Sequence, residues 1–253
     1  MFELWIPTRY RLQYCERMLG SLSKSDMPAE TPIRFMVDYG ECHERDTLLK
    51  LGDDLRLNVA VIDHRHKSSL VKLWNQSIIE SEADWTFITG DDSIFLRGWY
   101  AKCVEYMSND NLDLVYMAHY AGFAINKRLI PACGWFDERF LGGGYEDVDY
   151  QIRLSEAGVL NRVGGLNDPR LISHSRHTMD THDQGHWRGY GNETWWMKKW
   201  SKAHCEDFKS ANIRTEDEVD WYPLHTEEYA ARFGVTSQLD MINKLPRVHI
   251  PIV

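Results

Sequence analysis

Short apolar runs alternate with amphipathic stretches through the first hundred residues. Four runs have the length and the β-branched and aromatic content of buried strands: Phe2–Ile6, Ile33–Val37, Leu57–Ile62 and Trp85–Thr89. Three stretches between them carry the features of helices: Leu12–Leu22, Cys42–Leu51 and Ser69–Glu80. Strand–helix alternation of this kind predicts right-handed βαβ units and a largely parallel, Rossmann-like central sheet flanked by helices.

The second half of the chain is less regular. One more helix and four short strands are expected there: Gly98–Met107, and then Leu112–Met117, Ala121–Asn126, Asn161–Gly164 and Arg170–His174. Helical spacing returns at Asn192–His204, and the tail from Glu206 onward has only weak helical patterns. We assign no role to that tail.

A glycine-rich loop precedes a further predicted helix. Tyr150, Leu154 and Ala157 stand at i, i+4 and i+7, and Gly158 is where a C-cap belongs. The loop before this helix holds three consecutive glycines, Gly142–Gly144, which allow positive φ and a close approach of the backbone to a ligand.

Three carboxylates fall in the first turn of that predicted helix, at Glu146, Asp147 and Asp149. The helix dipole favours ionised carboxylates at this end, and a carboxylate beside a glycine-lined loop can act as a general base. The structural alternative is an ordinary acidic helix start, with a surface ion pair between Asp149 and Arg153.

The composition limits the class of protein. A chain of 253 residues that is 43% hydrophobic is long enough for one domain with appendages. We see no apolar run that could cross a membrane and no signal peptide. The five cysteines are scattered without a CxxC pair, which argues against a zinc cage or disulfide framework and for a reducing, cytoplasmic location. The net charge of -9 argues mildly against a nucleic-acid binder.

Polar residues follow three of the predicted strands, at Thr8-Arg9, Asp38 and Asp91-Asp92. Ligands of parallel sheets bind beyond the carboxyl ends of the strands, so these residues are expected to converge on a nucleotide site. Asp38 is an acceptor for a base or ribose, and the alternative is a capping aspartate. Arg9 and Arg11 either face phosphates or lie on the surface.

Asp91 and Asp92 are adjacent carboxylates at the end of an apolar strand. Such a pair is costly unless a cation or hydrogen-bond donors neutralise it. Hard oxygen ligands suit Mg²⁺ or Mn²⁺, with a substrate diphosphate completing the coordination shell. The alternative is a plain turn, because aspartate is favoured in turns.

Histidines and aromatic residues are frequent after the last predicted strand. His174 and His177 are candidate metal ligands, although no helical ligand pair such as HExxH is present, and a lone histidine is more often an ordinary surface or core residue. Trp187 and Tyr190 lie between glycines, in a stretch with the composition of a mobile lid that could stack on a sugar ring or base.

In their order and spacing, these segments resemble the nucleotide-sugar glycosyltransferases of the GT-A fold, family 2 and its relatives. The resemblance covers roughly residues 1–205. It rests on Pro7-Thr8-Arg9, Asp38 with Gly40, Asn75, Gly90-Asp91-Asp92, Gly134–Phe140 with Gly143–Tyr150, His174-Ser175-Arg176 and Asn192–Trp200. The most specific part is Gly134–Tyr150, with its galactosyltransferase-like Gly-Gly-Tyr-Glu-Asp. Two departures are the Asp-Asp-Ser order in place of Asp-x-Asp and Tyr39 in place of a small polar residue.

The resemblance implies a role for each matched residue. Asp147 would be the catalytic base. The metal ligands would be Asp92 and His174, binding Mn²⁺ or Mg²⁺ with the diphosphate, although the choice between Asp91 and Asp92 and between His174 and His177 stays open. The nucleotide sugar would be bound by Pro7, Thr8, Arg9, Asp38, Lys67, Asn75, Asp91, Gly143, Gly144 and Glu146.

The expected protein is therefore a metal-dependent inverting glycosyltransferase, with a UDP-sugar as the favoured donor. Its GT-A domain would cover residues 1–205, with a nucleotide-binding half at about 1–95 and a small acceptor-side subdomain at about 96–205, followed by an extension at 206–253. The acceptor would be a glycan, a protein or a small molecule. One alternative is transfer to a modified base in DNA, as in a phage enzyme, with a basic patch made of Arg188, Lys198, Lys199 and Lys202. A second is a sugar nucleotidyltransferase, which would need a glycine loop after the first strand. A third is a non-catalytic carbohydrate-binding protein.

Overall fold

The computed structural model describes residues 2–8, 11–38, 42–64, 70–138, 140 and 146–174. These residues divide into two compact units. The first unit takes the described residues within 2–64, 73–129 and 161–174, and it holds every strand. The second takes 70–72, 130–138, 140 and 146–160.

A mixed seven-stranded sheet forms the first unit, in the order β3-β2-β1-β4-β7-β6-β8. Strands β3, β2, β1 and β4 are mutually parallel, and β7 runs antiparallel to both β4 and β6. A second sheet pairs β5 with β9. The strands are β1 Phe2–Thr8, β2 Ile33–Asp38, β3 Val59–His64, β4 Trp85–Thr89, β5 Ser93–Phe95, β6 Leu114–Tyr116, β7 Gly122–Asn126, β8 Val163–Gly165 and β9 Ile172–His174.

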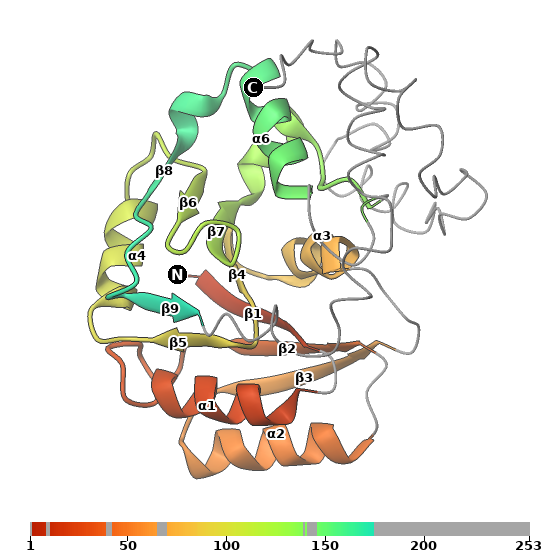
Figure 1. Ribbon diagram of the computed structural model, residues 1–253, viewed down its shortest axis with the longest axis vertical. Coiled ribbons are helices and arrows are strands. Elements are labelled where there is room, and N and C mark those ends of the chain that lie inside the picture. The colour runs from red at the N-terminus through yellow and green to blue at the C-terminus, as the bar shows by residue number, and fades with distance from the viewer. Residues whose placement is uncertain are drawn as a thin grey trace, which may run out of the picture. The chain divides into compact units, whose positions relative to one another are not determined.

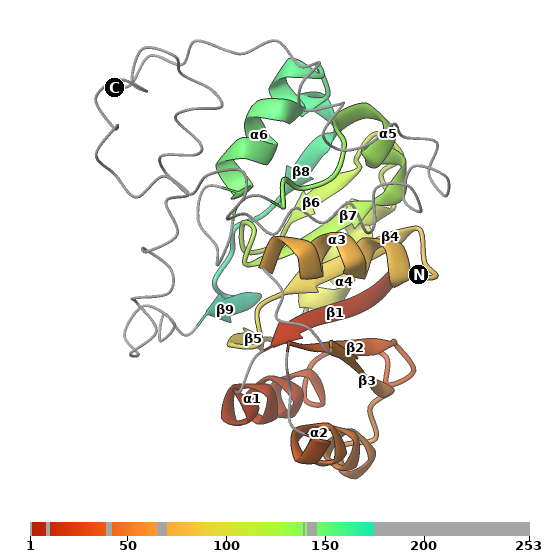
Figure 2. The ribbon, with the colours of Figure 1, turned by 90° about the vertical axis from the view of Figure 1, so that its right-hand side faces the viewer.

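Helices cover both faces of the parallel strands. Figures 1 and 2 show α1 and α2 on one side of β1–β3, and Figure 2 shows α3 on the other. This two-sided arrangement follows from the chain order, because α1 and α2 lead outward from β1 to β3 and α3 returns the chain to β4 on the far side of β1. The helices are α1 Leu12–Leu22, α2 Cys42–Asp54, α3 Leu70–Glu80, α4 Trp99–Met107, α5 Ile130–Cys133 and α6 Glu146–Glu156, with 3₁₀ turns at Lys127–Leu129 and Leu160–Arg162.

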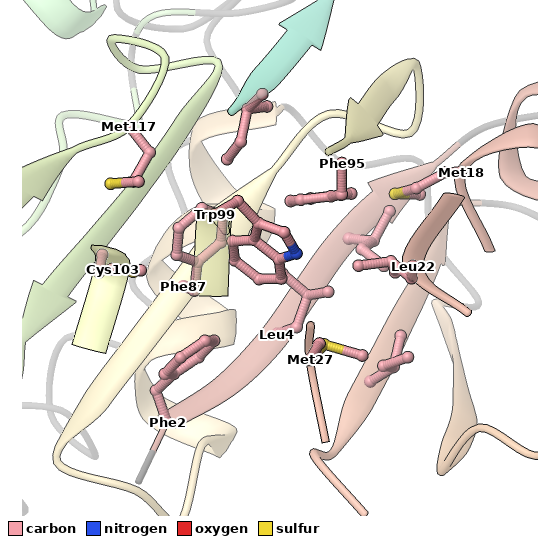
Figure 3. Packing of buried hydrophobic residues seen from close by; sticks show 14 of the residues in the cluster. Phe2, Leu4, Met18, Leu22, Met27, Phe87, Phe95, Trp99, Cys103 and Met117 are labelled. Carbon is pink, nitrogen blue, oxygen red and sulfur yellow. The ribbon is translucent and has the colours of Figure 1, made fainter. Parts of the chain in front are cut away.

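Trp99 of α4 lies at the centre of the main hydrophobic core. Its ring packs against Phe95 at 4.5 Å, Phe87 at 5.4 Å and Phe2 at 6.2 Å between centroids. Figure 3 shows these rings beside Leu4, with Met18 and Leu22 of α1 close by. All of these side chains are at most 2% exposed, so the core couples α1 and α4 to one face of the sheet.

Two polar side chains from the α1 region fix the segment that carries β5 and α4. Asp26 accepts hydrogen bonds from the backbone N–H groups of Gly98 (2.8 Å) and Ala101 (3.0 Å), and so caps a helix whose N-cap, Gly98, lies 72 residues later. Ser21 accepts a hydrogen bond from the Phe95 N–H at 3.0 Å. These contacts place the residues that follow Asp91-Asp92 against α1.

The strands and helices expected within the described residues are confirmed, with shifted ends, whereas the helix expected at Asn192–His204 lies outside those residues. Leu57–Ile62 is β3 Val59–His64, Leu112–Met117 shortens to β6, and Arg170–His174 shortens to β9. The strand expected at Asn161–Gly164 is wrong in its first half, because Leu160–Arg162 forms a 3₁₀ turn before β8. Gly158 has φ +68° after α6, as its predicted role as a C-cap requires.

Candidate functional site

The carboxyl ends of β1 and β4 lie side by side at the point where the strand order reverses. β1 is followed by α1 and β2 on one side, whereas β4, the next strand on the other side of β1, is reached from β3 through α3. Such a switch point leaves a crevice between neighbouring loops, where open α/β sheets bind their ligands. Thr8 ends β1, and Gly90-Asp91-Asp92 follows β4, so two of the three predicted strand-end groups meet here.

Asp91 joins the two strand ends. The Thr8 hydroxyl donates to Asp91 Oδ2 at 2.6 Å, and Arg11 Nη2 lies 3.3 Å from Asp91 Oδ1. Because the single Thr8 hydroxyl proton points at Asp91, the Cys15 thiol must donate in the 3.4 Å Thr8–Cys15 contact. Asp91 is only 3% exposed.

The contacts of Asp91 with Arg11 and Thr8 do not fully offset the cost of burying its negative charge. Burial raises the pKa of Asp91 to about 6, because desolvation outweighs the stabilisation that Arg11 and the Thr8 hydroxyl give to the charged form, while Asp92 adds repulsion. Arg11 Nη2 also lies 3.7 Å from Asp92 Oδ2. A pair of carboxylates in this state fits an added divalent cation, whose charge would offset the desolvation.

Asp92 and His174 belong to neighbouring backbone segments. Ser93, the residue after Asp92, pairs with His174 across the antiparallel β5–β9 ladder. The position of the His174 backbone therefore fits the predicted metal pair, while its side chain lies outside the described residues. Among the described side chains, no three His, Cys, Asp or Glu residues gather as a metal-binding group.

The turn itself is tightly built. The Ser93 N–H donates to the Gly90 carbonyl at 3.2 Å, and the Thr89 hydroxyl donates to the Ala121 carbonyl at 3.0 Å. A Cβ at Gly90 would lie 2.9 Å from Asp92 Oδ1, so a side chain there would push Asp92 aside. The turn expected as the structural alternative is thus present, together with a buried carboxylate that a turn does not require.

Two further predicted nucleotide-binding residues have defined places. Pro7 lies in β1 opposite Met36, and Asn75 is 0% exposed within α3. A buried amide in a helix facing the sheet is a polar group that must be hydrogen-bonded. Asp38 ends β2, but its side chain lies outside the described residues, as do Arg9, Lys67, Gly143 and Gly144. His177, Trp187, Tyr190 and everything beyond them lie there as well.

A second group of carboxylates begins α6, in the second unit. Glu146 is 5% exposed, whereas Asp147 is partly exposed and its Oδ1 accepts a hydrogen bond from the Val148 N–H at 2.8 Å. This N–H belongs to the first helical turn, where donors have no partner within the helix. Val148 is 38% exposed, so the surface around Asp147 has an apolar component.

The expected surface pair between Asp149 and Arg153 is wrong in its location, because both side chains are buried. Asp149 is 0% and Arg153 1% exposed, and Arg153 Nε donates to Asp149 Oδ2 at 2.9 Å. Arg153 Nη1 also donates to the carbonyls of Cys133 (2.9 Å) and Trp135 (2.7 Å). Burial by itself lowers the pKa of Arg153, but attraction to Asp149, together with smaller contributions from Cys133, Tyr150 and Asp137, outweighs it and the net displacement is upward. One of the three carboxylates is therefore structural, and two remain as candidates for chemistry.

Arg11 is the clearest residue that the sequence left undecided. The sequence offered phosphate binding or a surface position for it, and the structure places its guanidinium beside Asp91 and Asp92. Its guanidinium also lies over the Tyr14 ring, with Cζ 4.5 Å from the ring centroid. No local pattern could have shown this, because the contact joins residues 80 positions apart.

Within the part of the chain that is described, none of the helices combines the length and apolarity needed to cross a bilayer.

Comparison with known proteins finds likeness in structure only: the sequence matches no protein-family model and no curated protein. GalNAc-T7, solved with UDP, GalNAc and Mn²⁺, aligns with a TM-score of 0.64 at 11% identity over 97% of this chain and 57% of its own. Residues 1–349 of S. aureus TarS with UDP-GlcNAc give 0.58 at 14% identity over 93% and 73%. The mannosyltransferase PcManGT from Pyrobaculum calidifontis, with GDP-Man and Mn²⁺, gives 0.54 at 12% identity over 66% and 55%. The chain thus spans little more than half of PcManGT and of GalNAc-T7.

Proposed function

From the GT-A fold that the chain shares with these glycosyltransferases, we propose that it is a metal-dependent inverting glycosyltransferase that uses a UDP-sugar. One observation carries the proposal: Asp91, buried beside Asp92 at the switch point of the sheet, has a pKa raised to about 6 and so favours an added cation. UDP is favoured because the GalNAc-T7 structure and one of TarS hold it.

Each group in the proposed nucleotide site has a separate role. Thr8 and Asn75 hold the nucleotide, with Pro7, Arg9, Asp38 and Lys67 at the same carboxyl edge or in its loops. Asp92 and His174 bind Mn²⁺ or Mg²⁺, and Asp91 orients the ribose or the metal. When bound, the ion neutralises the charge that develops on the leaving diphosphate. Arg11, beside both aspartates, is available for the same phosphates.

Asp147 is the proposed base. It is a partly exposed carboxylate in the first turn of α6, and Val148 N–H holds one of its oxygens. Asp147 takes the proton of the acceptor hydroxyl as that oxygen attacks the anomeric carbon, so a single displacement inverts the configuration. Glu146 and the backbone at Gly143 and Gly144 contact the sugar. The acceptor is a saccharide, a protein or another small hydroxyl compound.

Thermal unfolding against UDP, GDP, dTDP, CMP and ADP tests the proposal, each with Mn²⁺ and with EDTA. A ligand at a hundredfold over its Kd adds about 2.7 kcal/mol, roughly 5–10 °C for a chain of this size. We expect UDP to raise the Tm by that amount with Mn²⁺ and by little in EDTA. If no nucleotide shifts the Tm in a metal-dependent way, Asp91-Asp92 is only a turn and the proposed activity fails.

A further inference from the structure

We infer that Arg153 is a positioning residue for the reaction, which fixes the rotation of α6 and thereby the direction in which Asp147 faces. The inference deepens the proposed function and rests on Asp147 being the base. It starts from a contrast on one helix: Asp149, Tyr150, Arg153 and Leu154 are buried, whereas Asp147 is partly exposed and Val148 and Gln151 are exposed. Two residues along a helix turn by about 200°, so Asp147 and Asp149 point in nearly opposite directions.

Arg153 ties the buried side of α6 to the chain that leads into the glycine-rich loop. Its guanidinium bonds at once to the Asp149 carboxylate of α6 and to the carbonyls of Cys133 and Trp135, with all three distances between 2.7 and 2.9 Å. Tyr150 adds a hydrogen bond from its hydroxyl to the Gly134 carbonyl at 3.2 Å. The Tyr150 ring also stacks on Phe136, at 4.0 Å between centroids and 21° between planes.

This set of contacts, which we call the α6 clamp (Asp149, Tyr150 and Arg153 with residues 133–136), leaves the helix little freedom to rotate or slide. Arg153 bonds to the carbonyls of Cys133 and Trp135 and Tyr150 to that of Gly134, so two points on the helix are tied to three successive residues of one short segment. The side chains of the clamp are at most 2% exposed. Displacing the guanidinium would separate a buried charge from its carboxylate and break its hydrogen bonds to two buried carbonyls, which is costly. The clamp therefore works as a rigid support for the first turn, where Glu146 and Asp147 stand.

The stability of α6 does not by itself require a buried ion pair between Asp149 and Arg153. An exposed i, i+4 ion pair contributes little to stability, and a buried pair can often be replaced by apolar side chains without loss. What an apolar pair would lack is the set of directed bonds to two carbonyls. Positioning within a small fraction of an ångström is what a base needs, since a displacement of about 1 Å can cost roughly a hundredfold in rate.

The test is Arg153→Lys, which keeps the charge but loses the planar fork that reaches three acceptors. With UDP-N-acetylglucosamine and Mn²⁺, we expect kcat for UDP release to fall by roughly ten- to a hundredfold, with KM for the donor within about twofold of wild type. Tyr150→Phe removes the bond to Gly134 and keeps the stacked ring. It should fold in any case and lower kcat by roughly two- to tenfold.

Arg128→Lys is the matched control. Arg128 contacts the buried carboxylate of Asp113 through Nε, and its Nη2 donates to the carbonyls of Asp110 (2.6 Å) and Leu112 (2.8 Å), so the same chemical change is made on an arginine of the first unit. We expect a lower Tm and an unchanged kcat. If Arg153→Lys and Arg128→Lys lower kcat equally, or if kcat at temperatures well below the Tm is unchanged in both Arg153→Lys and Tyr150→Phe, the inference is overturned.

Amide hydrogen exchange separates this inference from the proposed function. In Arg153→Lys and Tyr150→Phe, exchange of the amides of residues 146–150 should accelerate, while exchange in α1 stays at the wild-type rate. If wild type shows no metal-dependent nucleotide binding, the proposed function fails, yet unchanged exchange at 146–150 would still refute the clamp by itself.

Discussion

Two aspartates, Asp91 and Asp149, are both buried beside an arginine, and the two sites are built for opposite purposes. Asp91 faces an arginine at 3.3 Å whose side chain is 25% exposed, and it shares this partner with Asp92. Asp149 faces Arg153 at 2.9 Å, with both side chains at most 1% exposed and the guanidinium held by carbonyls. The first site leaves negative charge that a ligand can use, whereas the second encloses its carboxylate together with an arginine, so burial alone does not identify a functional carboxylate.

The difference lies in the partner rather than in the acid. Arg11 stands just before α1, beside a strand end, and 25% of its side chain is exposed to an approaching ligand. Arg153 is enclosed by its own helix and by the segment that precedes the glycine-rich loop. The predictions below test this contrast, from the largest expected effect to the smallest.

Asp147→Asn should have the largest effect, because it removes the proposed base while keeping the shape of the side chain. General base catalysis contributes roughly 10²–10⁴-fold, so kcat for UDP-N-acetylglucosamine turnover should fall by that factor. The Mn²⁺-dependent shift in Tm with UDP should stay at the wild-type value. Turnover near that of wild type would show that Asp147 is not the base, and Glu146 in the same helical turn would then be the candidate for that role.

Asp149→Ala should cost stability. It leaves the Arg153 charge buried beside a missing carboxylate, and breaking one partner of a buried pair costs about 3–5 kcal/mol. The free energy of unfolding in urea at 25 °C measures the loss. Glu105→Ala is the control, because Glu105 is 65% exposed in its pair with Lys102 and should cost less than about 1 kcal/mol. Equal losses in the two variants would contradict the contrast between buried and exposed pairs.

When no metal is present, Asp91→Asn should raise the free energy of unfolding, whereas Asp149→Ala lowers it. The pKa of Asp91 rises from 3.8 to about 6 on folding, so the folded state penalises the charged form above pH 6 by up to about 3 kcal/mol. As the pH falls from 6 to below 3.8, Asp91 is protonated first in the folded state and then in the unfolded chain, and the penalty disappears. In EDTA, Asp91→Asn should therefore unfold at higher urea than wild type at pH 7.5, and at nearly the same urea near pH 3.

The same variant should lose its advantage with ligand present. When Mn²⁺ and UDP are bound, the negative charge of Asp91 attracts the cation. Wild type should therefore gain more stability from the ligands than Asp91→Asn does. A variant that is less stable than wild type in EDTA at pH 7.5 would show that Arg11 already compensates Asp91, and the case for a cation at this site would weaken.

Much of the fold could be predicted because its signals are local. Leu12, Cys15, Leu19 and Leu22 mark the buried side of α1 within one helix, and the four apolar runs are strands β1 to β4. β5 was missed, because Ser93–Phe95 has three residues and is a strand only through its pairing with β9. β7 runs antiparallel for a reason that no residue pattern shows, since strand direction depends on how the connections cross the sheet.

The candidate site, like the fold, was predictable only where its signals are local in the sequence. Thr8, Asp91 and Asp92 could be found from the sequence, because polar residues at the ends of parallel strands meet at one edge. The pairing of Asp149 with Arg153 was visible at i, i+4, but its burial was not, since the carbonyls of Cys133 and Trp135 that hold the arginine come from about twenty residues earlier. The position of Arg11 depends likewise on the fold and not on its neighbours in sequence.

The cap that Asp26 places on α4 has a consequence for how the chain acquires its structure during synthesis. The N-terminus of α4 has its donors satisfied by a side chain that emerges 72 residues earlier, and Ser21 secures β5 in the same manner. A fragment that begins after β3 would contain all of α4 and yet lack both contacts, so it should form that helix poorly. The early part of the chain must therefore be present, and already near its final arrangement, before the turn that bears Asp91 and Asp92 is held in place.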